Sequence, residues 1–273
     1  MHTKHILLCL GLASIGALAI TSCSKQNEEA KKTIEFEQFN GSELFKLDNT
    51  AKVFQTDNDI LYQDSANLLL PVSIENHDIT ALRDSIMKAA FDTVAAPEEA
   101  MKKLFKAAVD DLGYSYEAAP DTLPRNDIDG STIVNGDVFC MSTSRITFRV
   151  TNYTYFPGAA HGMTITRFVN YSICDNKVIS LNDIFTAEGI AKLPAAINTK
   201  AKQLAPVIGP TDEITAVPTN GNYYINLDDA ITFVYQPYEI ASYAQGLIQI
   251  PFYAYQLSDY MTPYGLKLFN LGE

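Results

Sequence analysis

The sequence predicts an α+β fold, with an antiparallel β-sheet, helices packed on one of its faces, and two subdomains. Three observations lead to this prediction. Several short segments alternate apolar with polar residues, two longer segments carry apolar residues at helical spacing, and a turn-rich stretch at 118–136 separates two halves. About 240 residues of ordinary globular composition follow the N-terminal segment, which is enough for one large domain or two small ones.

The first half, residues 33–117, is predicted to be an N-terminal α+β subdomain. Residues 33–39 (TIEFEQF) alternate as a half-buried strand does, and 67–74 (NLLLPVSI) form a second strand whose proline suits a sheet edge or a bulge. Residues 79–90 and 97–112 then switch to helical spacing, and each helix presents one apolar stripe. Both stripes are expected to pack on the sheet.

The second half, residues 137–273, is predicted to be a C-terminal α+β domain that opens with a β-hairpin. Residues 144–156 place Ile146, Phe148 and Val150 on one face, and 164–173 form the partner strand. Pairing Phe156 with Met163 fixes the predicted register. The later elements are a short strand, a helix interrupted by Pro194, and three further strands, at 177–181, 186–204, 222–227, 230–235 and 246–255.

The N-terminal segment predicts export from the cytoplasm. A short basic start precedes an apolar run at 6–20, and the sequence Ile20-Thr21-Ser22-Cys23 resembles the lipobox of bacterial lipoproteins. That resemblance implies that residues 1–22 are a lipoprotein signal peptide and that Cys23 carries lipid such as palmitate. Residues 23–32 are then a flexible tether. The alternative is an ordinary secretory signal with a chance cysteine. Both alternatives predict an extracytoplasmic protein, which the lipid would anchor to the membrane.

The charge balance argues against nucleic acid as a partner. The chain has 20 Lys+Arg and 32 Asp+Glu, for a net charge of -12. Removal of residues 1–22 takes one lysine and no acid, so 19 basic residues remain against 32 acidic ones, a net charge of -13. Nucleic-acid binding needs a dense basic face instead. The acidic balance is compatible with a cationic partner, or with solubility alone.

Two cysteines, Cys140 and Cys174, remain after Cys9 leaves with the signal and Cys23 is lipidated. An oxidising compartment permits a disulfide between them. The predicted hairpin register places Cys174 opposite Arg145, with Cys140 about 16 Å further along the strand. A disulfide needs Cα atoms within about 7 Å. The bridge therefore requires the chain to fold back after residue 141.

No recognised catalytic or metal-binding motif occurs in the sequence. GxSxG, HExxH and paired CxxC motifs are absent, and 125–136 matches only half of a calcium loop because Arg125 and Gly136 occupy its first and last ligand positions. Processing leaves two histidines, His77 and His161. The prediction is therefore no cofactor, no metal and no catalysis. Nine of the 15 tyrosines fall between 223 and 264, where they suit sheet packing or, as an alternative, stacking on sugars.

Several segments resemble a known family. Residues 155–162 (YFPGAAHG), 179–185 (ISLNDIF) and 231–246 (ITFVYQPYEIASYAQG) are similar to the extracytoplasmic C-terminal domain of the anti-sigma factor RsiV, domain of unknown function 3298. Residues 69–72 and the helix up to 91 resemble, more loosely, the preceding domain of RsiV and of PdaC-type peptidoglycan deacetylases, domain of unknown function 4163. Together with the lipobox, this resembles a Bacteroidetes-type lipoprotein.

The resemblance implies a lipid-anchored cell-envelope binding protein, because RsiV-like domains sense or bind outside the membrane and RsiV is a lysozyme receptor. The expected partners are a cationic protein such as lysozyme, or peptidoglycan. The alternatives are a structural envelope lipoprotein, or an enzyme acting on glycan or peptide with His161 as acid/base. The candidate ligand-binding residues lie on the hairpin loop and on a later turn: Phe156, Pro157, Gly158, Ala159, Ala160, His161, Gly162, Pro237, Tyr238 and Glu239.

Overall fold

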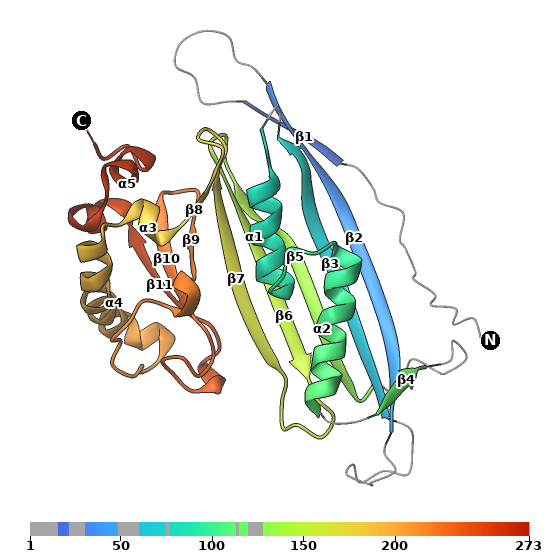
Figure 1. Ribbon diagram of the computed structural model, residues 1–273. Helices are drawn as coiled ribbons and strands as arrows, with labels where there is room; N and C mark the ends of the chain where they lie inside the picture. Colours follow the sequence, from blue (N-terminus) through green and yellow to red (C-terminus); the bar gives the residue numbers. More distant parts are fainter. Residues whose placement is uncertain are drawn as a thin grey trace.

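The computed structural model describes residues 16–21, 31–48, 60–74, 77–112, 115–119 and 128–272, which form one large and one small β-sheet with five α-helices (Figure 1). The α+β prediction is confirmed. The large sheet has eight strands: β1 (Gly16–Thr21), β2 (Lys31–Leu47), β3 (Ile60–Ile74), β4 (Tyr116–Ala118), β5 (Gly130–Met141), β6 (Arg145–Tyr155), β7 (Met163–Ser172) and β8 (Lys177–Ile179).

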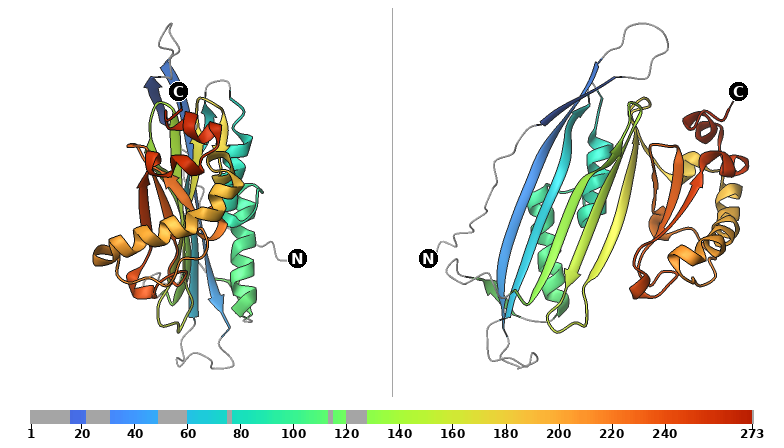
Figure 2. Two further views of the ribbon diagram at one scale, coloured as in Figure 1. Left: turned by 90° about the vertical axis from the view of Figure 1, so that its left-hand side faces the viewer. Right: turned by 180° about the vertical axis from the view of Figure 1, so that it is seen from behind.

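The large sheet runs in the order β1-β2-β3-β5-β6-β7-β8, and β4 pairs with β2. All of its pairs are antiparallel except β3 with β5, which is parallel. Parallel neighbours need a long crossover connection, and this one contains two helices, α1 (Thr80–Phe91) and α2 (Pro97–Leu112). The crossover places both helices on one face of the sheet (Figures 1 and 2).

The predicted helical stripes are core faces. Leu82 and Ile86 of α1, and Met101 and Phe105 of α2, are buried in one cluster with the apolar face of the large sheet. The hairpin contributes Ile146, Phe148 and Val150 to the same cluster, as its alternation predicts. Burial of these side chains removes apolar surface from water and is the main stabilising term for this layer.

The smaller sheet has its own core. It consists of β9 (Tyr223–Ile225), β10 (Ala230–Tyr235) and β11 (Ile248–Tyr253), in the order β11-β10-β9. Helices α3 (Leu181–Ile184), α4 (Ala187–Ile208) and α5 (Pro263–Leu268) accompany it, with short 3-10 turns η1 (Thr219–Gly221), η2 (Tyr243–Gln245) and η3 (Ala254–Tyr260). The predicted interruption at Pro194 is wrong. Helix α4 continues because Leu193, Ile197 and Ala201 stay buried against the small sheet.

The predicted connecting loop at 118–136 is wrong for residues 130–136, which are the first seven residues of β5. They pair with residues 62–68 of β3. This segment contains Gly130, Asn135 and Gly136, residue types that favour turns, but the backbone on both of its sides is paired within the sheet. Strands from both predicted halves therefore share one sheet.

The hairpin register differs from the prediction by two residues. Thr154 pairs with Met163 and Arg145 with Ser172, so the connecting loop is longer than expected. The cause is Phe156, which leaves the sheet and stacks on Tyr62 with ring centroids 6.4 Å apart. A two-residue shift keeps every side chain on its predicted face.

The Cys140–Cys174 disulfide is not formed, because Cys140 is a free thiol. Strand β6 separates β5, which carries Cys140, from β7, which ends just before Cys174. Two strand spacings amount to about 10 Å, beyond the reach of a disulfide. The Cys140 thiol instead donates to the Ile225 carbonyl at 3.3 Å, and burial raises its pKa.

Amide side chains join the two sheets along β7. Strand β8 pairs only with residues 170–172 of β7. Nearer the start of β7, the Asn222 side chain accepts a hydrogen bond from the Phe168 N–H and donates one to the Thr166 carbonyl. Gln236 accepts from the Thr166 N–H and donates to its carbonyl. The buried Asn170 amide links the Tyr223 carbonyl to the Ile225 N–H on β9. Side chains thus satisfy a sheet edge that would otherwise be unpaired.

The N-termini of α4 and α5 cross each other beside the smaller sheet. The Thr186 N–H donates to the Tyr260 carbonyl at 3.0 Å, and the Thr262 N–H donates to the Ile184 carbonyl at 2.8 Å. Thr186 caps α4 through the Gly189 N–H, and Thr262 caps α5 through the Gly265 N–H, both at 2.9 Å. The same Thr-x-x-Gly pattern therefore begins both helices, and each glycine faces the other segment.

Strand β1 lies inside the segment predicted as a signal peptide and pairs with the start of β2. Cys23 lies outside the described residues, as does most of the predicted tether. The part of the chain that the structure describes holds no helix with the length and hydropathy of a membrane span.

Candidate functional site

The two predicted ligand-binding segments lie next to each other. The loop at 156–162 joins β6 to β7, and the turn at 237–239 follows β10. The Tyr238 hydroxyl lies 3.2 Å from His161 Nε2, and these residues are 77 positions apart in the chain. Tyr243 of η2 joins them, with its ring centroid 3.8 Å from that of His161 and 18° between the ring planes. We refer to His161, Tyr238 and Tyr243 as the aromatic platform.

Hydrogen bonds fix the orientation and tautomer of His161. Its Nδ1 lies 3.0 Å from the Gly162 carbonyl, which can only accept, so Nδ1 carries the proton. In the neutral ring Nε2 then accepts from the Tyr238 hydroxyl. The Tyr243 hydroxyl also donates to the Gly162 carbonyl, at 2.6 Å. The platform is therefore a fixed arrangement rather than three independent side chains.

Tyr238 is held in a conformation that is costly for a bulky residue. Its φ is 69°, in the left-handed region, and 59% of the residue is exposed. The turn is held by the Tyr238 N–H, which donates to the Ala241 carbonyl at 3.1 Å, and by Glu239, which accepts from the Gln236 N–H at 2.8 Å. Glu239 also accepts from Thr219, so both of its carboxylate oxygens are already used.

The remaining predicted loop residues divide into supporting and accessible groups. Pro157 and Gly162 are buried, Phe156 and Ala159 are half-buried, and Gly158 and Ala160 are exposed. A side chain at Gly162 would meet the Tyr153 ring at 2.4 Å, so this position supports the loop rather than a ligand. The exposed part of the predicted set is Gly158, Ala160, His161 and Tyr238.

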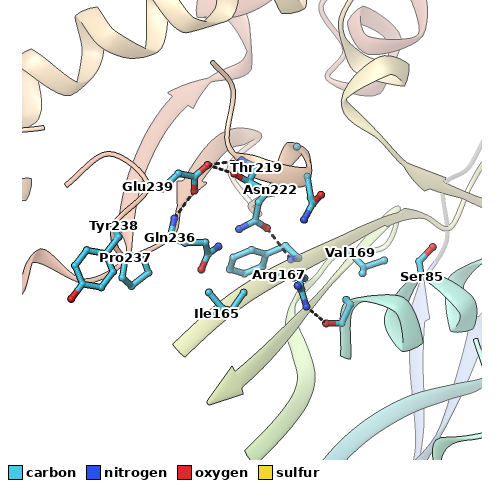
Figure 3. Close-up of a pocket in the computed structure, with 14 residues that line it drawn as sticks. Ser85, Ile165, Arg167, Val169, Thr219, Asn222, Gln236, Pro237, Tyr238 and Glu239 are labelled. Carbon is cyan, nitrogen blue, oxygen red and sulfur yellow. Dashed lines mark hydrogen bonds between the residues drawn. The ribbon is translucent and has the colours of Figure 1, made fainter. Parts of the chain in front are cut away.

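A cleft that sequence reasoning missed adjoins the platform at Tyr238 (Figure 3). It has a volume of about 520 Å³ and continues into a second hollow of about 440 Å³ that shares Ser85, Phe168 and Val169 with it. Helix α1 and strand β7 form one wall, and turns before β9 and after β10 form the other. The lining residues are Ser85, Ala89, Ile165, Arg167, Phe168, Val169, Thr219, Asn220, Gly221, Asn222, Gln236, Pro237, Tyr238 and Glu239.

Comparison with known proteins finds a similarity that includes part of this site. Residues 182–253 match the family model described as "Protein of unknown function (DUF3298)". This stretch of the chain is therefore similar to a DUF3298 domain. A DUF3298 member from Bacteroides fragilis has a similar structure, with a TM-score of 0.60 at 19% identity over 85% of this chain and 95% of that one. A DUF3298 protein from Pseudomonas aeruginosa has a TM-score of 0.52 at 16% identity over the same shares. No curated protein matches.

The structural likeness extends well beyond the DUF3298 match. Both neighbours cover 85% of this chain, so the similarity includes most of the residues that form the large sheet. Within the site, the match includes Asn222, Gln236 and Tyr238, whereas His161 and Arg167 precede it. The platform and the cleft therefore lie where the segment that matches DUF3298 meets the large sheet. The predicted N-terminal domain of unknown function 4163 stays a prediction.

A buried carboxyl lies outside the platform and the cleft. Asp64 on β3 is 0% exposed, and neither of its oxygens has a hydrogen-bond partner among the described residues. Burial raises its pKa to about 8, Thr132 opposes this rise, and the carboxylate of Glu43 adds to it. Glu43 and Thr132 are its direct neighbours on β2 and β5. Nothing in the local sequence marks Asp64, because a single aspartate in an alternating strand reads as a solvent-facing residue.

The described residues contain no group of three or more His, Cys, Asp or Glu side chains placed to hold a metal ion. The groups that this site presents to a ligand include the exposed side chain of Tyr238 on the platform and the guanidinium of Arg167 in the cleft.

Proposed function

We propose that this protein is a lipid-anchored binding protein of the bacterial cell envelope, without catalysis, and that the aromatic platform receives its ligand. The observation that carries the proposal is Tyr238, which is 59% exposed on a left-handed backbone and fixed by His161. A rigid, exposed tyrosine offers contact area at a small cost in conformational entropy, and such residues often dominate binding energy. Strained backbone is also concentrated at functional sites.

The proposed partner is a cationic protein such as lysozyme. The chain carries 32 acidic and 20 basic residues, and opposite charge accelerates the encounter of two proteins. The resemblance of residues 155–162 to the RsiV loop supports the same partner, since RsiV is a lysozyme receptor. Peptidoglycan is the second proposed partner, because aromatic faces also stack on sugar rings.

The position of His161 supports binding rather than acid/base chemistry. Both ring nitrogens are used, Nδ1 toward Gly162 and Nε2 toward Tyr238. A triad-type base needs a nucleophile in reach and an acid that orients it. Among the described residues, the ring contacts of His161 are with Tyr238 and Tyr243 instead. We therefore propose that His161 positions Tyr238.

Tyr238→Ala is expected to weaken lysozyme binding roughly 30-fold, because a central tyrosine anchor contributes about 2 kcal/mol. The measurement is titration calorimetry with hen lysozyme at about 50 mM and about 150 mM salt. Binding should be weaker at the higher salt concentration, because salt screens the attraction between the two proteins. Tyr255→Ala is the matched control, since Tyr255 is 62% exposed and stacks on Tyr253 rather than on the platform. Its affinity should equal that of the wild type.

Two outcomes would contradict this proposal. Absence of salt-sensitive association at micromolar concentrations would remove lysozyme as the partner. If His161→Ala lowers the melting temperature and leaves the binding of lysozyme and of peptidoglycan fragments unchanged, the loop has a structural role only.

A further inference from the structure

The walls of the cleft are rigid because their amides are already used. Asn222 and Gln236 bond to the backbone of β7, and both oxygens of Glu239 accept from neighbouring groups. Glu239 therefore contributes little acceptor capacity to a ligand. Arg167 and Glu239 are the two charged residues in the lining. Arg167 is therefore the charged residue that can still form hydrogen bonds with a ligand.

Arg167 is held in place by the end of α1. Its Nη1 donates to the Ala89 carbonyl at 2.9 Å, and this bond is the dashed line that leaves the end of the labelled Arg167 side chain in Figure 3. Its Nη2 lies 3.8 Å from the Asp92 carboxylate, which is 78% exposed. Free carbonyls at a helix C-terminus favour a cation there. Among the described residues, Nε makes no hydrogen bond. The bond from Nη1 thus fixes the orientation of the guanidinium, while Nε and Nη2 can still donate hydrogen bonds to a ligand.

We propose that the cleft binds a small organic carboxylate that carries an apolar body, with the carboxylate on Arg167. An arginine presents two parallel donors that match the two oxygens of a carboxylate. Ile165, Val169 and Pro237 supply the apolar wall for the body. A volume of about 520 Å³ lies in the range of small-molecule sites. A single cation favours a singly charged carboxylate over phosphate, whose larger charge is usually met by several donors.

The proposal is tested with pairs of acids and uncharged counterparts. The pairs are N-acetylphenylalanine with its amide and N-acetylleucine with its amide. Binding to the purified protein is followed by the shift of the Arg167 Nε–H resonance in NMR titrations. At least one acid should bind ten-fold or more tightly than its counterpart and shift that resonance. If no acid exceeds its counterpart, or if inorganic phosphate binds as well as the best acid, the proposal is overturned.

Variants distinguish loss of ligand binding in the cleft from loss of folding. Arg167→Gln should lower the affinity for the acid at least ten-fold, and Ser85→Phe should do the same by filling the cleft, while Ser85→Ala binds normally. Asn152→Ala is the matched control for the lost helix contact, because Asn152 donates to the next α1 carbonyl, that of Ala90, at 2.7 Å and does not line the cleft. Loss of acid binding in Asn152→Ala, with retained circular dichroism, would contradict the role of Arg167.

The inference does not depend on the platform. Arg167 does not belong to the platform, so Arg167→Gln should lower the affinity for the acid and leave the affinity for lysozyme unchanged. Failure of lysozyme binding and failure of acid binding are therefore separate results.

Discussion

The free energy of unfolding is expected to fall as the pH rises from about 4 to about 8, and Asp64→Asn is expected to remove most of that fall. The folded-state pKa of Asp64 is raised to about 8 from an ordinary value of 3.8. Between these two values the folded state keeps a proton that the unfolded chain has released. Stability therefore decreases with pH across this window, by at most about 1.4 kcal/mol per pH unit.

The measurement is denaturant unfolding at intervals between pH 5 and pH 8. Over this range the contribution of Asp64 alone is on the order of 3–4 kcal/mol, and the neutral amide of Asp64→Asn does not titrate. The stability of the variant relative to that of the wild type should therefore rise by about this amount between pH 5 and pH 8. An equal pH slope in both proteins would show that Asp64 is not the group responsible.

Glu43→Gln provides a second, graded test. Glu43 is the direct cross-strand neighbour of Asp64, and burial raises its pKa while Lys102 on α2 opposes the rise. Removal of its charge should ease ionisation of Asp64 in the folded state, so that the fall in stability ends at a lower pH and is smaller in total. The groups that face Asp64 are the Glu43 carboxylate on β2, the Tyr62 hydroxyl on β3 and the Thr132 hydroxyl on β5. The two hydroxyls bond to each other at 2.7 Å.

Gly189→Ala and Gly265→Ala are each expected to destabilise the protein by at least about 2 kcal/mol. A Cβ at Gly189 would lie 2.2 Å from the Tyr260 carbonyl oxygen, and one at Gly265 would lie 2.2 Å from the Ile184 carbonyl oxygen. Both obstacles are backbone atoms, fixed by the crossing of the two helix starts. A methyl group there forces the crossing apart, and no side-chain rotation relieves it.

Thermal unfolding measures this effect, and the melting temperature should fall by about 4–8 °C for a chain of this size. Gly272→Ala is the matched control, because its added methyl would meet Leu266 at an ordinary 3.7 Å. A melting temperature unchanged in both Gly189→Ala and Gly265→Ala would mean that the crossing opens at little cost.

The sequence determined the elements that depend on local pattern. The alternation at 144–156 and the helical stripes at 79–90 and 97–112 predicted core faces that the structure confirms, because burial of one face imposes a period of two on strands and 3.6 on helices. The sequence also marked the loop at 156–162 and the turn at 237–239, since small residues and proline there indicate turns. It did not predict that His161 and Tyr238 would touch.

Tertiary structure alone decided the features that depend on distant partners. Residues 130–136 became a strand because β3 and β6 offered backbone partners on both sides, against the turn preference of their sequence. Asp64 became a buried carboxyl because its neighbours came from β2 and β5, and Arg167 entered the cleft because the end of α1 lay beside β7. Local pattern reports only which face of an element is apolar. The energy of pairing, burial and charge depends on residues that the fold brings together from elsewhere in the chain.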